Sequence, residues 1–103
     1  MRNSIRVELE AHVEALKSDG VLTQDNKEDW HFHAFNEDYY IIGYYEAEQW
    51  LKGHSISPFE AIETVKEYEQ ENFGEVHTKF DNAESVVNMY VYILGEQIIQ
   101  EMD

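Results

Sequence analysis

The sequence predicts an all-α domain of about four helices, with or without a minor two-stranded β piece. Two segments begin with strong helix-capping patterns, apolar residues recur at three- and four-residue spacing, and Pro58 is the only proline. The chain has 103 residues, 43% of them hydrophobic, and no linker-like stretch divides it. We therefore expect residues 1–103 to form a single acidic helical domain around one core.

The first expected helix begins at Asn3 or Ser4 and ends at Asp19. Its apolar residues recur at helical spacing on one face, and Gly20 followed by Val21 is typical of a left-handed C-terminal cap. The residues of that face are Ile5, Leu9, His12, Val13 and Leu16. This pattern predicts an ordinary amphipathic helix.

Two segments, residues 30–35 and 75–80, stay open between different structures. WHFHAF and EVHTKF both alternate in a way that permits short strands, which would pair with each other. Residues 30–35 fit a short helix equally well, because Asp25-Asn26-Lys27-Glu28 is a plausible helix start.

Residues 38–45, DYYIIGYY, hold the densest aromatic cluster in the chain. Tyr and Ile favour strands, and Gly43 costs a helix up to about 1 kcal/mol relative to alanine, so a buried strand over residues 39–45 is an alternative. The continuation to Gly53 favours a helix that is capped by Asn36 or Asp38 and ends at this glycine. Such a helix aligns Tyr40, Tyr44, Ala47 and Leu51.

A helix over this cluster would be apolar on every side, which is typical of a central helix or of one that contacts a second subunit. Gly43 would then allow close approach of another helix. The candidate oligomer interface consists of Tyr39, Ile42, Gly43 and Tyr45.

The last two expected helices have the clearest starts. Ser57-Pro58-Phe59-Glu60 forms a capping box with proline at the first helical position, and the helix ends at Asn72-Phe73-Gly74. Its expected buried residues are Ala61, Ile62, Val65 and Tyr68. The final helix begins with Asp81-Asn82-Ala83-Glu84, capped by Asp81, and its wide apolar face continues towards the C-terminus.

The chain is strongly acidic, with 22 acidic residues against 7 basic ones and a net charge of -15. This charge argues against direct binding of nucleic acid or anionic membrane and favours a cationic partner. The competing explanation is that the acid serves only solubility. The N-terminal residues mix charge into every turn, unlike a signal peptide or a membrane span, so we expect a soluble cytoplasmic protein.

No pattern of catalytic residues is present, and we expect no enzyme and no cofactor. The chain has no cysteine, no Gly-x-Ser-x-Gly and no glycine-rich phosphate loop. His31 and His33 would share one side of a strand, with His77 as a distant third ligand, but nothing nearby completes a metal set. Only Glu28 and His31 have the Glu-x-x-His spacing of di-metal bundles, which need two such pairs. We therefore expect no metal site; a metal-dependent enzyme that uses His31 and His33 is the weakest alternative.

Four glutamates of the third expected helix form a stripe that composition alone does not require. Their spacing of three, four and four places them within about 80° of one another, and their repulsion costs about 0.2–0.5 kcal/mol per neighbouring pair. The stripe is about 16 Å long, and one DNA strand carries a phosphate about every 3.4 Å. The candidate partner-binding acidic residues are Glu60, Glu63, Glu67 and Glu71, extended by Glu37, Asp38, Glu46 and Glu48.

Three segments, YYIIGYYEAEQWLKGH, YEQENFGE and NAESVVNMYVYILGEQIIQ, resemble small acidic proteins of marine bacteriophages, especially those of cyanobacteria. The resemblance covers most of residues 31–100. It implies a phage origin and no established activity, so it assigns no functional residues. In size, charge and helical character the chain is also similar to phage antirestriction proteins, which are acidic DNA mimics and are often dimeric. Lys52, Lys66 and Lys79 interrupt the acid here, unlike in the most extreme mimics.

The leading hypothesis is a non-enzymatic phage-type protein that binds a basic, nucleic-acid-binding protein of the host. DNA mimicry of a restriction enzyme or another defence enzyme is its sharpest version. The alternative is a small structural or assembly oligomer, such as a homodimer, in which the acid serves only solubility.

Overall fold

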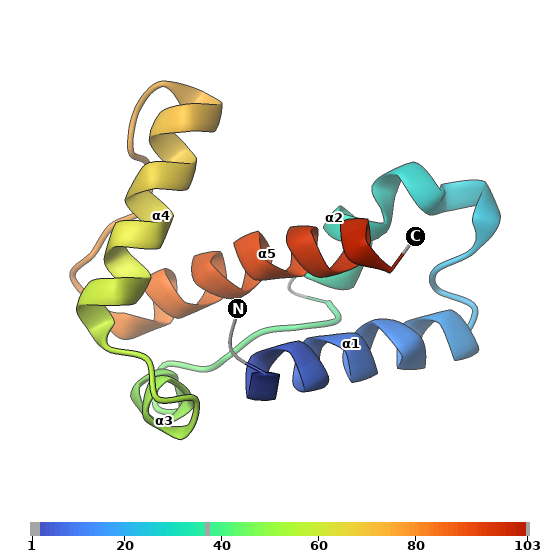
Figure 1. Cartoon of the computed structure of the whole chain (residues 1–103), viewed down its shortest axis with the longest axis horizontal. Helices are drawn as coiled ribbons and strands as arrows, with labels where there is room; N and C mark the ends of the chain where they lie inside the picture. The colour runs from blue at the N-terminus through green and yellow to red at the C-terminus, as the bar shows by residue number, and fades with distance from the viewer. Residues whose placement is uncertain (1–2, 37, 103) are drawn as a thin grey trace. The chain divides into compact units, whose positions relative to one another are not determined.

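The computed structural model describes residues 3–36 and 38–102, and all regular structure within them is helical (Figure 1). This confirms the predicted all-α class, with five α-helices and one 3₁₀ helix among the described residues. These residues contain no strand, so the expectation of a minor β piece is wrong for them. The elements are Asn3–Ser18 (α1), Gln24–Asp29 (η1), Trp30–Ala34 (α2), Ala47–Gly53 (α3), Pro58–Phe73 (α4) and Ala83–Glu101 (α5).

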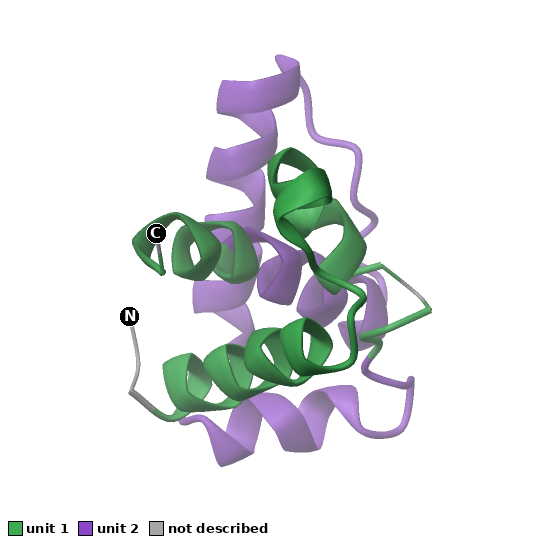
Figure 2. Ribbon diagram, turned by 90° about the vertical axis from the view of Figure 1, so that its right-hand side faces the viewer, with its two compact units in different colours: residues 1–41, 94–103 green, residues 42–93 purple. Residues whose placement is uncertain are grey.

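The helices group into two compact units, which Figure 2 distinguishes by colour. Unit 1 contains residues 1–41 and 94–103, and unit 2 contains residues 42–93. Helix α5 contributes its residues up to Ile93 to unit 2 and its residues from Leu94 to unit 1. That residues 1–103 form one domain stays a prediction.

In the part of the chain that the structure describes, no helix is both long enough and apolar enough to span a membrane.

Helix α1 has the amphipathic pattern that its sequence predicts. Ile5, Leu9, Val13 and Leu16 are all buried, at helical spacing. Gly20 ends the helix in the left-handed region at φ 78°, and the backbone N–H of Val21 donates to the Leu16 carbonyl at 3.0 Å. The predicted start and cap of this helix are therefore confirmed, and the helix ends at Ser18, one residue before the predicted Asp19.

Residues 24–34 are helical, so the helix alternative for residues 30–35 is confirmed and the strand alternative is wrong. Trp30 and Ala34 lie one turn apart and are both buried. The indole Nε1 of Trp30 donates to the Thr23 carbonyl at 2.8 Å and to Asn26 Oδ1 at 2.9 Å, and Asn26 Nδ2 donates to the Val21 carbonyl at 2.9 Å. These bonds hold η1 against the start of α2.

Within unit 1, side chains of α1 hold the segment that follows it. His12 Nε2 donates to the Ala34 carbonyl at 2.6 Å, and the Tyr40 hydroxyl donates to Glu8 Oε2 at 2.6 Å. Arg6 forms ion pairs with Glu10 and with Glu101 near the end of α5. Hydrogen bonding to Glu101, helped by the charges of both glutamates, raises the pKa of Arg6 above its usual value against the effect of desolvation. These exposed pairs contribute little to stability.

The helix predicted over residues 39–53 forms only from Ala47, so its first part is a correction. Asn36 does not cap a helix; its Oδ1 accepts the Asp38 N–H at 2.9 Å, and its carbonyl accepts the N–H of Tyr40 at 2.9 Å, which makes a turn. A new turn from Gly43 then leads into α3, where the Ala47 N–H donates to the Gly43 carbonyl at 3.1 Å. The strand alternative for residues 39–45 is also wrong.

Asn88 explains why this segment is neither helix nor strand. The backbone N–H of Ile42 donates to Asn88 Oδ1, and Asn88 Nδ2 donates to the Ile42 carbonyl, both at 2.8 Å. A side-chain amide therefore satisfies both backbone groups of a buried residue. Ile42 is 7% exposed, and the bond that would continue a helix through it is replaced by one to a residue of α5.

Gly95 of α5 has the close-approach role that the sequence suggested for Gly43. A Cβ atom at position 95 would lie 2.6 Å from Cδ2 and 2.7 Å from Cζ of Phe35, a buried ring in the same unit. At position 43 the nearest atoms belong to the flexible carboxylate of Glu46. The Phe35 ring therefore occupies the space above Gly95, while Gly43 lies outside any helix.

Helices α4 and α5 begin as predicted, with one shift. Ser57 Oγ accepts the N–H of Glu60 at 3.1 Å, and Gly74, with φ 75°, caps the C-terminal end of α4. At α5 the cap is Asn82, not Asp81, because the N–H of Ser85 donates to Asn82 Oδ1 at 3.0 Å. Asn82 directly precedes the first helical residue, where a short side chain reaches the third helical N–H.

The connection from α4 to α5 depends on a buried carboxylate. Glu69 of α4 is 2% exposed. Its Oε1 accepts the backbone N–H groups of His77 at 3.0 Å and Thr78 at 2.9 Å, and its Oε2 accepts the Thr78 hydroxyl at 2.7 Å. Residues 75–80 form no strand because these donors bind a side chain of α4 and not a neighbouring strand. The predicted strand alternative for this segment is wrong.

Burial raises the pKa of the Glu69 carboxyl, but the bonds from Thr78 and His77 outweigh it, so the pKa lies below its ordinary value of 4.5. A lowered pKa means that the folded state favours the charged form. The carboxylate therefore contributes stability above pH 4.5, and this contribution is lost as the pH falls through the lowered pKa.

A valine placed at Gly95 should destabilise the chain much more than a valine at Gly43. Overpacking against the Phe35 ring should lower the free energy of unfolding by about 1–3 kcal/mol, whereas the Glu46 side chain can move aside at a cost below about 0.5 kcal/mol. Urea unfolding of the two variants measures this difference. Equal losses at both positions would contradict the assigned packing of Phe35.

Replacing Glu69 by alanine should lower the free energy of unfolding at pH 7 by about 2–3 kcal/mol, because part-buried donors of His77 and Thr78 lose a charged acceptor. Glu69→Gln keeps the shape, and its deficit relative to the wild type should shrink as the pH falls below 4.5. The exposed Glu67→Gln is the control, with little effect at either pH. A Glu69→Gln deficit that does not depend on pH would refute the role of the charge.

Candidate functional site

Helix α4 has one buried side and one charged side. Ala61, Val65 and Glu69, each four residues apart, are buried. Ile62 and Tyr68, which the sequence places in the buried stripe, are half-buried. The regular i, i+4 series of buried residues fixes which side of the helix faces the rest of unit 2.

The four glutamates of the predicted stripe, which we call the acidic face, lie on the opposite side. Each of the last three follows a buried residue by two positions, and residues two apart on an α-helix differ by about 200° in direction. Glu63, Glu67 and Glu71 are exposed, and Glu60, in the first turn, is half-buried. The predicted stripe is therefore one surface of one helix.

The charge of the acidic face is largely uncompensated. Among residues 3–36 and 38–102, no basic side chain forms an ion pair with Glu63, Glu67 or Glu71. Lys66 lies on the same helix, but its Nζ stands 5.4 Å from the centre of the Phe80 ring. Three neighbouring carboxylates therefore face solvent together, which favours a cationic partner.

The other predicted acidic residues are divided. Glu46 and Glu48 are exposed at the start of α3 in unit 2, and Asp38 is exposed in unit 1. Glu37 lies outside the described residues. The structure thus places Glu60, Glu63, Glu67 and Glu71 on one helix, whereas Asp38, Glu46 and Glu48 lie outside that helix.

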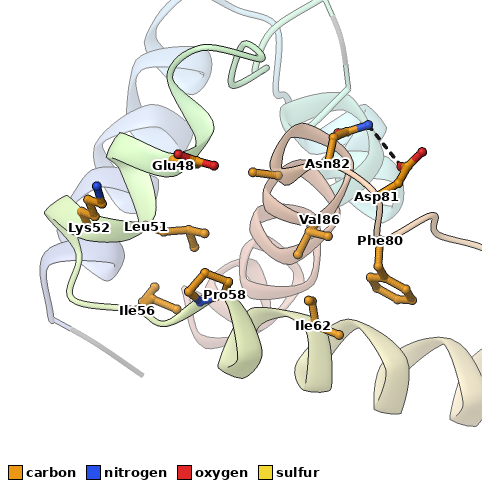
Figure 3. Close-up of a pocket in the computed structure, with 11 residues that line it drawn as sticks. Glu48, Leu51, Lys52, Ile56, Pro58, Ile62, Phe80, Asp81, Asn82 and Val86 are labelled. Carbon is orange, nitrogen blue, oxygen red and sulfur yellow. Dashed lines mark hydrogen bonds between the residues drawn. The ribbon is translucent and has the colours of Figure 1, made fainter.

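Unit 2 also contains an apolar pocket of about 460 Å³ (Figure 3). Leu51, Ile56 and Val86, which line it, are buried, and the lining residues Ile62, Phe80 and Ala83 are half-buried. These residues come from α3, α4, α5 and the segments between them. In Figure 3 the side chains of Leu51, Ile62 and Val86 point into the space between the helices.

Four polar residues border the pocket. Glu48 and Asp81 are exposed carboxylates, Lys52 is an exposed cation, and Asn82 donates to Asp81 Oδ1 at 3.3 Å. Figure 3 shows Glu48 reaching towards the Asn82 side, with Lys52 at the far edge of α3. The pocket is therefore apolar inside and net negative at its border.

The candidate oligomer interface is only partly available on the surface. Tyr45 is 87% exposed and Tyr39 is 44% exposed. Ile42 is buried and held by Asn88, and Gly43 is half-buried beside it. The role of these residues in self-association stays a prediction.

His31 and His33 do not share a side, because they lie two residues apart on α2 and not on a strand. His31 Nδ1 stands 3.8 Å from Glu96 Oε2 of α5. The described ranges contain no group of three or more His, Cys, Asp or Glu side chains that could hold a metal ion.

Three features that organise unit 2 were not predicted from the sequence: the buried Glu69, Asn88 and the pocket. Glu69 continues the buried series of Ala61 and Val65, and Asn88 is a lone amide within an apolar helix, so both had a local signal. The pocket had none, because its lining comes from three helices that are separated in sequence.

No protein-family model, no curated protein sequence and no solved structure matches the chain.

Proposed function

We propose that this chain is a non-enzymatic binding protein whose acidic face contacts the basic surface of a nucleic-acid-binding protein. The observation that carries the proposal is the exposed position of Glu63, Glu67 and Glu71, opposite the buried side of α4 and without a basic partner among the described residues. Mutual repulsion of these carboxylates costs about 0.2–0.5 kcal/mol per neighbouring pair. A cationic surface would relieve this cost on binding.

DNA mimicry is the sharpest version of the proposal. The acidic face spans about 16 Å from Glu60 to Glu71 at about 1.5 Å per residue. A DNA strand presents roughly five phosphates over that length, since they recur about every 3.4 Å. Four carboxylates on one rigid helix approach this charge density and could occupy a cleft that normally binds a DNA backbone.

The setting that we propose is a phage protein acting in the cytoplasm of its host. Its sequence resembles small acidic proteins of marine phages, and its charge is similar to that of antirestriction proteins. A restriction enzyme or another defence enzyme of the host has the required basic surface. No direct contact with nucleic acid or with a membrane is part of the proposal, because the net charge of -15 opposes both.

A variant with Glu60, Glu63, Glu67 and Glu71 all changed to Gln tests the role of the acidic face. Immobilised wild-type chain should retain nucleic-acid-binding proteins from a cyanobacterial lysate, and duplex DNA should displace them. The four-Gln variant should retain at least about tenfold less, because each lost charge pair contributes about 0.2–1 kcal/mol. Quantitative mass spectrometry of the retained proteins measures the ratio.

The matched control removes the same number of charges elsewhere. Glu14, Asp19, Asp25 and Glu28 are exposed acids of unit 1, and their amide variant carries the same net charge as the four-Gln variant. Its binding should fall much less. Equal recovery of every retained protein by wild type and the four-Gln variant would rule out the acidic face as the binding surface.

A second candidate function is a structural or assembly oligomer. It is favoured by the exposed aromatic pair Tyr44 and Tyr45, which are 60% and 87% exposed and stack edge-to-face with ring centres 5.3 Å apart. Adjacent exposed aromatic side chains are typical of protein contact surfaces.

If the tyrosine pair mediates self-association, the wild type should form a dimer whose mass is stable as the salt concentration rises. Tyr45→Ser should then weaken the dimer at least about tenfold, because a central aromatic anchor contributes about 2 kcal/mol or more. Light scattering at several protein and salt concentrations measures this, with the exposed Phe32→Ser as control. A monomer at every concentration would exclude this candidate.

A further inference from the structure

The apolar pocket of unit 2 is a feature that the acidic face does not explain. Among its lining residues, Leu51, Ile56 and Val86 are buried, and Ile62 and Phe80 are half-buried. When a ligand covers the apolar side chains of an open pocket, binding is stabilised by about 25 cal/mol per Å² of apolar surface removed from water.

We propose that this pocket receives a bulky apolar side chain from a short basic segment of the partner protein, with a lysine or arginine beside that side chain. This inference rests on the proposed function, because it assigns a second contact to the same basic partner. The occupant is a peptide segment of a different protein, not a small metabolite and not a second copy of this chain.

The size of the pocket fits such an anchor. Its volume of about 460 Å³ lies within the range of about 300–1,000 Å³ that is typical of ligand sites. That space accommodates a large aromatic side chain or two neighbouring aliphatic ones. Aromatic anchors that fill pockets commonly dominate the energy of protein interfaces.

The charges at the border favour a basic segment over a neutral or acidic one. Glu48 and Asp81 border the pocket, against the single cation Lys52. Unit 2 as a whole contains ten acidic and three basic residues, a net charge of -7. A peptide cation next to the apolar anchor would therefore be attracted at the border while its neighbour is buried.

The pocket and the acidic face share helix α4. Pro58 and Ile62 of the first turns line the pocket, and Glu60 of the same turns begins the acidic face. One partner that presents both an apolar anchor and a basic surface would thus contact a single helix in two ways. The face would supply attraction, and the pocket would supply selectivity.

The test is selection of a random dodecapeptide library on the immobilised full-length chain. The selected peptides should share a leucine or an aromatic residue next to lysine or arginine. Ala83→Trp, which places an indole at the side of the pocket, should weaken the best peptide at least tenfold by calorimetry. Circular dichroism checks that this variant is folded.

Two substitutions at the border leave the pocket open and test the charges there, because opposite effects on peptide affinity are expected for an acidic and a basic residue. Glu48→Gln should weaken the peptide about two- to fivefold, and Lys52→Gln should strengthen it by a similar factor. Glu75→Gln removes an exposed acid outside both the pocket and the acidic face and should change nothing. If Glu48→Gln and Glu75→Gln change the peptide affinity equally, the charges at the border of the pocket do not contribute to binding as proposed.

The outcomes separate this inference from the proposed function. The selected peptides could be basic, lack an apolar anchor and bind Ala83→Trp as tightly as the wild type. That result would contradict the proposed pocket contact and would be consistent with the proposed acidic face. Selected peptides that are apolar but contain no lysine or arginine would contradict the proposal that the occupant is a basic segment. They would also be evidence against a basic partner protein. A library that yields no binding peptide overturns the pocket inference, as does a wild-type dimer that Ala83→Trp abolishes, because the occupant would then be a second copy.

Discussion

The carboxylate of Glu69 organises the part of unit 2 on which both proposed contacts depend. It is nearly inaccessible to water, yet it stays charged because three donors of His77 and Thr78 satisfy it. A buried charge without such partners would be strongly destabilising, so the helix and the following segment must be held together. This bond set fixes the side of α4 that faces inward, and the acidic face is the opposite side. It also holds the chain just before Phe80 and Asp81, which line the pocket.

Asn88 holds the segment before α3 in place by hydrogen bonds, as Glu69 holds the segment after α4. Its amide binds both backbone groups of Ile42 and also the Glu84 carbonyl of its own helix. In each case a polar side chain on a helix hydrogen-bonds to an irregular backbone segment that has no strand partner. Backbone groups buried without hydrogen bonds are costly, and these two side chains remove that cost without a β-sheet. This arrangement explains how an all-helical chain keeps long irregular connections in place.

The structure agrees with the sequence prediction where the controlling signals are local. Ser57, Pro58 and Gly74 are each sufficient to place one end of α4, and Gly20 does the same for α1. The prediction failed at residues 39–45 because the decisive bond to Ile42 comes from Asn88, which is 46 residues away. Neither the strand preference of tyrosine nor the helical spacing of the segment contains information about that partner.

The candidate site divides in the same way. The acidic face could be predicted because helical periodicity places Glu63, Glu67 and Glu71 opposite Ala61 and Val65, whatever the rest of the chain does. The pocket could not, since α3, α4 and α5 must first come together to form it.

Exposed charge and apolar shape also differ in what they can contribute to binding. A row of carboxylates accelerates encounter with any basic surface but discriminates poorly among such surfaces, whereas a shaped apolar pocket discriminates by what fits inside it. Selective binding of one basic protein would need the second property as well as the first. The acidic face and the pocket of unit 2, which share helix α4, are our candidates for the two.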